Sequence, residues 1–229
     1  MNKTKVLCLS GSLRAEASNS EKMLQLLMRY IREFGGEPTL IRLAEKNIIA
    51  CEGCYSKTRD GSKCTYPCIH DGKDDTQEVL RAIIASDAIA ISTGVYWAGP
   101  SSLVQKLLEK MTAIENNERQ IGESIGREPL SGKPFVLLAS QEGEGASMAL
   151  SQISWALSHM GFIFLPYGGI YKPALLERKL ARVGLRLLNE RKFEWIDNTI
   201  RLAVKNLVEI PRRLEGFSFD DRQVQEPRC

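Results

Sequence analysis

Short apolar runs alternate with longer amphipathic stretches along the chain. The apolar runs predict five buried strands, over residues 5–9, 38–43, 88–92, 135–139 and 162–166. Apolar residues at helical spacing predict five helices, over residues 20–34, 75–86, 100–114, 147–160 and 175–188. Strands interleaved with helices are typical of an α/β protein, in which a parallel sheet is covered on both faces.

Right-handed crossovers leave few topologies for such a sheet, chiefly the doubly wound ones. Ligands bind these folds beyond the carboxyl ends of the strands, where the strand order reverses. The loops after the first, third and fourth strands are therefore the places where we expect a site. We assign residues 1–190 to the main domain and residues 191–229 to a C-terminal helix and tail. Residues 44–73 form an irregular insert after the second strand, and residues 115–130 resemble a linker.

The C-terminal part carries six large apolar residues at helical spacing: Phe193, Ile196, Ile200, Val204, Leu207 and Ile210. Such a stripe either covers the chain's own sheet or packs against a second subunit. Five helices already suffice for the two faces of the sheet, and soluble monomers rarely expose a patch of this size. We therefore expect a homodimer or homotetramer, with the site near the interface.

Composition and charge exclude two classes of partner. The net charge is +3 with 43% hydrophobic residues, and the basic residues form no stripe of the kind that binds nucleic acid. No apolar run approaches the roughly 18–20 residues that cross a bilayer. The N-terminus enters the first strand at once, which leaves no room for a signal peptide. We expect a cytoplasmic protein that acts on a small molecule, with neither nucleic acid nor membrane as its partner.

The loop after the first strand, SGSLRAEASNS, has the residues of an anion site. It leads into a helix, whose N-terminus presents unpaired N–H groups and a partial positive charge. Serine hydroxyls, an amide and the guanidinium of Arg14 can all donate hydrogen bonds to phosphate. The spacing fits neither a P-loop nor a dinucleotide-binding turn. The alternative is a hydrophilic loop with a serine helix cap.

The pattern G-S-x-R-x-x-x-S-x-S resembles the phosphate loop of the flavodoxin-like NAD(P)H-dependent FMN reductase family. Gly11, Ser12, Arg14, Ser18, Asn19 and Ser20 carry the match. The resemblance implies a flavodoxin-like three-layer sandwich with strand order 2-1-3-4-5 and FMN as cofactor. It implies contacts with the FMN phosphate from Ser10, Ser12, Leu13, Arg14, Ser18, Asn19 and Ser20.

Residues 92–111 resemble the same family's second loop, whose backbone and aromatic side chain edge the isoalloxazine ring. Thr93, Gly94, Val95, Tyr96, Trp97 and Gly99 are the implied contacts, with Gly94 where the family usually has proline. A flat cofactor needs close backbone approach and an aromatic wall. The alternative is that Tyr96 and Trp97 only pack at the start of a helix, although two adjacent aromatic residues cannot both face the core.

The loop after the fourth strand supplies the third implied contact, with the edge of the flavin ring. Its residues are Ser140, Gln141, Glu142, Gly143 and Gly145. The glycines permit a close-approach turn, and the polar residues offer partners. The resemblance covers roughly residues 3–170.

The insert holds four of the six cysteines, Cys51, Cys54, Cys64 and Cys68, in the spacing C-x2-C-x9-C-x3-C. In a reducing compartment such a cluster indicates metal or redox chemistry more often than disulfides. Iron–sulfur flavoproteins, relatives in the same family, carry a cysteine motif in this loop followed by two aspartates, here Asp74 and Asp75. Lys57 stands where the third ligand is expected. A [4Fe–4S] cluster, a zinc site and free thiols all stay open. We expect His70 to be solvated.

The resemblance implies an enzyme that passes hydride from NADH or NADPH to FMN and electrons onward to a quinone, a flavin or another acceptor. No residue is assigned as a catalytic acid or base, because hydride transfer at the flavin needs none. The alternatives are an electron carrier of the iron–sulfur flavoprotein or flavodoxin type and a thiol or metal sensor. Carriers of the flavodoxin kind are usually strongly acidic, and this chain is not.

Overall fold

The computed structural model describes residues 3–173 and 194–214. Five parallel strands form one sheet in the order β2-β1-β3-β4-β5. Their bounds are Lys5–Gly11 (β1), Glu37–Arg42 (β2), Ala88–Gly94 (β3), Pro134–Gln141 (β4) and Ile163–Pro173 (β5). The helices are Asn19–Glu33 (α1), Thr76–Ala85 (α2), Ser102–Glu115 (α3), Glu118–Ile125 (α4), Ala146–His159 (α5) and Glu194–Arg213 (α8). The predicted doubly wound sheet and its strand order are confirmed.

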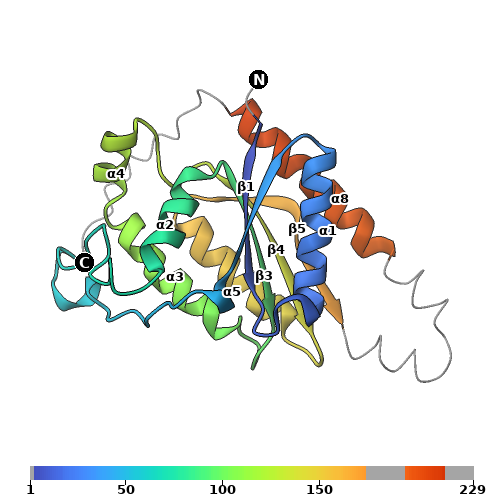
Figure 1. Cartoon of the computed structure of the whole chain (residues 1–229), viewed down its shortest axis with the longest axis horizontal. Coiled ribbons are helices and arrows are strands. Elements are labelled where there is room, and N and C mark those ends of the chain that lie inside the picture. The colour runs from blue at the N-terminus through green and yellow to red at the C-terminus, as the bar shows by residue number, and fades with distance from the viewer. Residues whose placement is uncertain (1–2, 174–193, 215–229) are drawn as a thin grey trace.

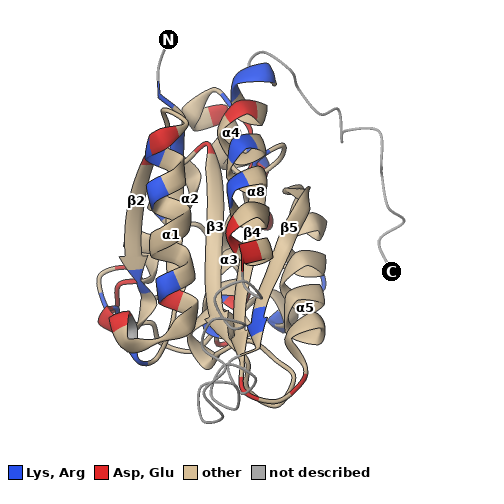
Figure 2. Ribbon diagram, turned by 90° about the vertical axis from the view of Figure 1, so that its right-hand side faces the viewer, with Lys and Arg blue, Asp and Glu red and all other residues tan. Residues whose placement is uncertain are grey.

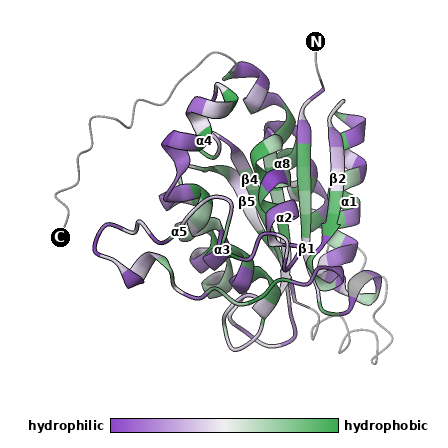
Figure 3. Ribbon diagram, turned by 60° about the vertical axis from the view of Figure 1, so that its left-hand side comes forward, coloured by the Kyte–Doolittle hydropathy of each residue, from purple (hydrophilic) through white to green (hydrophobic). Residues whose placement is uncertain are grey.

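Two hydrophobic cores lie on opposite faces of the sheet, which makes the three layers visible in Figure 1. On one face, α2, α3 and α5 pack against side chains such as Leu9, Ile91 and Phe135. On the other face, α1 and α8 cover the alternate positions, including Cys8 and Leu138. The central strands β1, β3 and β4 are buried along nearly their whole length, as expected for a parallel sheet, and β1 is mainly green in Figure 3. The edge strands β2 and β5 are partly exposed.

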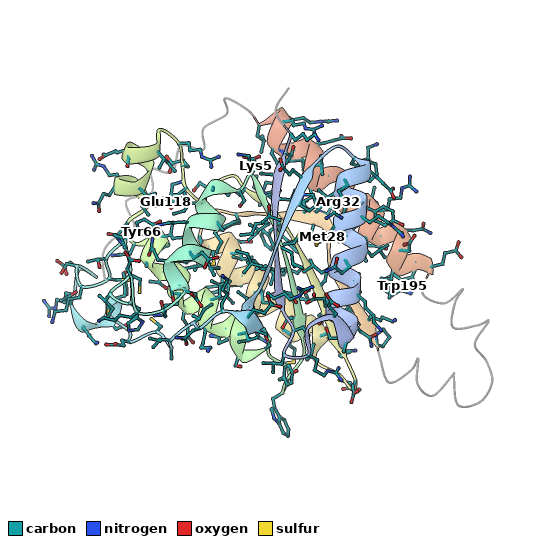
Figure 4. The ribbon with its side chains drawn as sticks, viewed as in Figure 1. Lys5, Met28, Arg32, Tyr66, Glu118 and Trp195 are labelled. Carbon is teal, nitrogen blue, oxygen red and sulfur yellow. The ribbon has the colours of Figure 1, made fainter. Side chains whose placement is uncertain are left out.

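The expectation that five helices suffice to cover both faces of the sheet is wrong, because α8 covers part of one face. Ile200, Val204 and Leu207 of the apolar stripe are fully buried, and they pack in the same core as α1. Figure 2 shows α1 and α8 side by side over the tan strands, with their charged residues turned outward. Figure 4 places Met28 and Arg32 on α1 and Trp195 near the start of α8. The stripe is therefore a covering face of the sheet.

The homodimer or homotetramer stays a prediction, without support from this stripe. Phe193, the predicted helix over residues 175–188 and the predicted domain boundary at 190 lie outside the described residues. Among residues 3–173 and 194–214, no helix has the length and apolar character that a membrane crossing requires.

Two elements differ from their predicted form. Residues 118–125, expected to be part of a linker, form the short helix α4, of which Ile121 is the buried residue. Gly126 ends it in a left-handed conformation with φ 72°. Strand β5 is longer than predicted, because a register irregularity opposite residues 135–137 lets pairing with β4 resume at Gly169.

The insert begins with the short helix η2 (Leu43–Glu45), contains a second short helix, η3 (Tyr55–Lys57), and ends at α2. It lies beside α2 and α3 in Figure 1. Asn116 and Asn117, at the end of α3, donate side-chain hydrogen bonds to the carbonyl of Cys64 at 2.8 and 2.9 Å. Lys106 donates to the carbonyl of Ile48 at 2.9 Å. The insert is thus held against α3 by polar side chains.

Candidate functional site

The three loops singled out from the sequence leave the same edge of the sheet. Gly11 at the end of β1 is level with Thr93 of β3, and Gly94 is level with Ser140 of β4. The backbone N–H of Val95 donates to the carbonyl of Ser140 at 3.1 Å, which joins the second and third loops. Strand order therefore brings together residues that are over a hundred positions apart in the sequence.

The first loop wraps the N-terminus of α1. Ser18 is the N-cap, and its hydroxyl accepts the backbone N–H of Glu21 at 3.1 Å. The hydroxyl of Ser12 accepts the backbone N–H of Arg14 at 3.1 Å. Ser12, Ser18 and Ser20 are buried, while the guanidinium of Arg14 is exposed. The loop thus presents hydroxyls, helix N–H groups and one cation at a single point.

A buried carboxylate supports this loop from beneath. Glu21 is fully buried, and it accepts hydrogen bonds from the hydroxyl of Ser10 and, at 2.6 Å, from Nε of Arg42 on β2. Arg42 also bonds Glu16 at 2.8 Å. The bond to Glu21 and nearby carboxylates raise the pKa of Arg42, although burial alone would lower it. This ion pair fixes the start of α1 to both strands.

Close packing at the end of β1 requires glycine at position 11. A Cβ at Gly11 would lie 2.2 Å from Val104 Cγ2 and 2.9 Å from the Ser92 carbonyl oxygen. Helix α3 begins one residue after Ser101, whose hydroxyl accepts the backbone N–H of Val104. The absence of a side chain at residue 11 therefore lets α3 start directly beside the first loop.

The second loop is a tight turn that displays two aromatic side chains. Tyr96 and Gly99 exchange backbone hydrogen bonds at 2.9 Å, and the two residues between them, Trp97 and Ala98, have positive φ of 50° and 63°. Non-glycine residues rarely adopt this conformation, which is uncommon outside functional sites. The turn leaves Trp97 fully exposed at its tip and Tyr96 about half exposed. Neither aromatic ring packs in the hydrophobic core, which argues against the alternative that both residues only pack at the start of a helix.

The third loop touches the second one. Gly145, with φ 97°, would place a Cβ 2.7 Å from Ala98 Cα, so only glycine fits this approach. The side-chain oxygen of Gln141 accepts the backbone N–H of Ala146 at 2.7 Å and caps the start of α5. The loop is thus held between the turn and α5.

The three loops enclose one cavity of about 800 Å³, within the range of sites for small molecules and cofactors. The predicted residues that line it are Ser12, Arg14, Ser18, Asn19, Ser20, Gly94, Val95, Tyr96, Trp97, Ser140, Gln141, Glu142, Gly143 and Gly145. The lining also includes Ala98, Glu144 and Met148, which the sequence patterns did not mark.

Four of the predicted contacts do not line the cavity. Ser10 is bonded to Glu21, and the hydroxyl of Thr93 donates to the carbonyl of Gly94 and accepts the backbone N–H of Ser101. Leu13 is about half exposed, and Gly99 closes the turn by its backbone bonds to Tyr96. Ser10, Thr93 and Gly99 therefore shape the loops that surround the cavity.

The residues of the cavity fit a flavin mononucleotide. Three buried serine hydroxyls and Arg14 lie at the N-terminus of α1, the donor set that a phosphate needs. The aromatic turn and Met148 lie on the same cavity and offer apolar surface for a flat ring. One wall therefore suits the charged end of the cofactor and another suits its ring.

The four cysteines of the insert line a second, much smaller cavity of about 20 Å³, with Lys110 and Ala113 of α3 as part of its wall. Burial raises the pKa of Cys64 to about 11, and the neighbouring thiols of Cys51, Cys54 and Cys68 add to this shift. Among the described residues, no three His, Cys, Asp or Glu side chains take up a metal-binding arrangement. The insert therefore brings together four thiols, the donor set of an iron–sulfur cluster, but does not place them in a metal-binding geometry.

His70 corrects the expectation of a solvated side chain. It is 4% exposed and lies in the wall of the thiol cavity. Its Nε2 lies 2.9 Å from Glu52 Oε1, and its Nδ1 contacts the Nζ of Lys110. The surrounding sequence is polar, so this burial comes from α3, which is distant in the chain.

A family model described as NADPH-dependent FMN reductase matches residues 4–172. An iron–sulfur flavoprotein of Methanocaldococcus jannaschii is 33% identical over 106 residues, which are 46% of this chain and 51% of that protein. An iron–sulfur flavoprotein of Archaeoglobus fulgidus is 24% identical over 169 residues, 74% of this chain and 75% of that one. The first of these matches thus spans about half the length of its relative.

Solved structures support the fold. RosB, described with bound 8-demethyl-8-formylriboflavin-5′-phosphate, aligns with a TM-score of 0.67 at 19% identity, over 94% of this chain and 82% of that one. A flavone reductase aligns with a TM-score of 0.62 at 16% identity, over 94% of this chain and 66% of that one. At such low identity the likeness extends to the fold alone.

Proposed function

Since the chain belongs to the NADPH-dependent FMN reductase family, we propose that it takes electrons from NADH or NADPH and passes them through FMN to a quinone, a flavin or another small acceptor. Membership of the family supports the coarser assignment, a flavin-dependent oxidoreductase. The observation that carries the proposal is the 800 Å³ cavity with a phosphate cradle and an aromatic turn on the same lining.

The residues of this chain bind and orient the cofactor. Arg14 and the hydroxyls of Ser12 and Ser20 would hold the phosphate, and the N-terminus of α1 would add its partial positive charge. The Tyr96–Gly99 turn limits one side of the ring. Bound FMN would accept a hydride and supply the redox chemistry, so the protein needs no acid or base of its own at that step.

We expect the purified chain, loaded with FMN, to lose its flavin absorption when NADH or NADPH is added without oxygen. An accessible cavity with FMN held by its phosphate leaves the ring open to a nicotinamide. The measurement is the visible spectrum during anaerobic titration, with dithionite as the control for complete reduction. Bleaching by dithionite but by neither nucleotide would contradict the enzyme and favour the electron carrier.

A second candidate function is electron transfer through an iron–sulfur cluster in the insert. Four thiols on one cavity favour it, and two relatives carry the name iron–sulfur flavoprotein. Cys51, Cys54, Cys64 and Cys68 would hold the cluster, which exchanges single electrons. Zinc bound by the same thiolates, or no metal at all, are the competing outcomes.

We expect anaerobically purified protein to contain iron and acid-labile sulfide, because thiolates are the ligands that such clusters prefer. Elemental analysis would measure iron, sulfide and zinc together. Cys54→Ser should lose most of the metal, while Cys229→Ser, a cysteine outside the insert, should keep it. Zinc without sulfide would identify a structural zinc site, and metal-free protein in the unmodified chain would reject both.

A further inference from the structure

Lys110 is a buried cation beside the thiol cavity. Only 2% of the residue is exposed, and its Nζ lies 3.8 Å from Cys68 Sγ. It comes from α3, so a rigid helix aims it at the insert. Lysine rarely occurs fully buried unless it is paired, which raises the question of its counter-charge.

Its other contact is the buried imidazole of His70. The ammonium group of Lys110 only donates, so His70 Nδ1 accepts from it and Nε2 carries the proton that is donated to Glu52 at 2.9 Å. The carboxylate of Glu52 also lies 3.4 Å from the ammonium of Lys57. The chain of bonds runs from an exposed carboxylate through a neutral imidazole to Lys110, and from there to sulfur.

No carboxylate among the described residues makes an ion pair with Lys110. Asp74 is a carboxylate beside the same imidazole, with its Oδ2 4.0 Å from His70 Nδ1. Asp74 already accepts the backbone N–H groups of Ile49 at 2.9 Å and Thr76 at 3.0 Å. Burial would raise the pKa of Asp74, but these bonds and the charge of Lys110 lower it overall. Of its two direct partners in the described residues, His70 is neutral in this tautomer, so the Cys68 sulfur is the one in direct contact that can bear negative charge. The Asp74 carboxylate acts on Lys110 only from a greater distance.

We propose that Lys110 is the fixed counter-charge of a thiolate-bound metal centre formed by Cys51, Cys54, Cys64 and Cys68, with His70 and Glu52 holding its ammonium toward Cys68. This inference rests on the metal centre suggested above as the second candidate. Four thiolates around a divalent ion or an iron–sulfur core carry net negative charge, and a buried cation offsets it. An N–H···S hydrogen bond to a ligand sulfur is a known means of tuning such centres.

The test measures Co²⁺ binding to the full chain after the bound metal has been removed with a chelator under reducing, anaerobic conditions. Thiolate ligation of Co²⁺ gives near-ultraviolet charge-transfer bands, which report binding without enzyme activity. Lys110→Met keeps the length of the side chain and Lys110→Gln keeps a donor, and both remove the charge. Each should weaken Co²⁺ binding by about 10–100-fold. The matched control is Lys106→Met, on the same helix, whose Nζ bonds the Ile48 carbonyl and touches no thiol.

The outcomes separate the two proposals. Weaker binding in both Lys110 variants, with Lys106→Met within about threefold of the unmodified chain, supports the counter-charge. Equal affinity in the folded Lys110 variants overturns the role of Lys110 and leaves the metal centre standing. Equal weakening by Lys106→Met also overturns it, because the effect then reflects a loosened insert. No thiolate bands in the unmodified chain overturn both proposals. Far-ultraviolet circular dichroism establishes that each variant is folded.

Discussion

Replacing Ser12 and Arg14 together by alanine is expected to yield purified protein that is almost free of FMN. Hydrogen bonds to a charged group contribute about 1.5–3 kcal/mol each, so losing two weakens binding on the order of 10²–10⁴-fold. The Ser12 hydroxyl also accepts the backbone N–H of Arg14, so the double change frees the loop that carries the cation. The measurement is the ratio of flavin to protein, followed by the Kd for added FMN.

The matched control changes the same residue types away from the cavity. Arg29 is exposed on α1 and pairs with Glu33, and Ser154 is partly exposed on α5. Arg29→Ala with Ser154→Ala should leave the FMN content unchanged, because neither side chain lines the cavity. Retention of FMN in the Ser12 and Arg14 variant would place the phosphate elsewhere and would remove the basis of the proposed flavin site.

The place of the cavity could be predicted from the sequence because one physical rule determines it. Parallel strands end at a common edge, so loops after the first, third and fourth strands must meet there. The same rule does not indicate which residues of those loops line the cavity and which support the loops from within. Ser10 and Ser12 are two positions apart and chemically identical, yet Ser10 is bonded to Glu21 and Ser12 lines the cavity. Burial of Glu21 beneath the loop, paired with Arg42 of β2, decides this difference.

Contacts between distant segments account for the other differences. Ala98 enters the lining because Gly145 approaches it from the third loop, and Met148 because α5 begins beside that loop. His70 reads as solvated in a polar insert, and Lys110 of α3 buries it. A pattern in one segment cannot indicate which segment it will meet. The alternation of elements predicted a doubly wound sheet, and the order of its strands, which relates distant segments, came from the family resemblance.

The sequence of α8 likewise could not indicate what its apolar stripe packs against. A substitution in this stripe provides the second prediction with a large expected effect. The spacing of its apolar residues was compatible with a subunit interface or with a helix that covers the sheet. Contacts with α1, β4 and β5 show that the helix covers the sheet. We expect Leu207→Ala to lower the free energy of unfolding by about 2–5 kcal/mol, because it leaves a cavity in a fully buried position. Urea denaturation followed by circular dichroism would measure it.

The same helix offers a control of the same residue type. Leu202 lies on the outer face of α8 with 45% of its surface exposed, so Leu202→Ala should change the free energy of unfolding by no more than about 0.5 kcal/mol. Sedimentation should give the same assembly for both variants, since Leu207 faces the sheet and not a partner. If Leu207→Ala altered the assembly while the unfolding free energy stayed constant, α8 would be an interface helix after all. A loss of stability in Leu207→Ala alone would instead establish that residues beyond 190 complete the flavin-binding core.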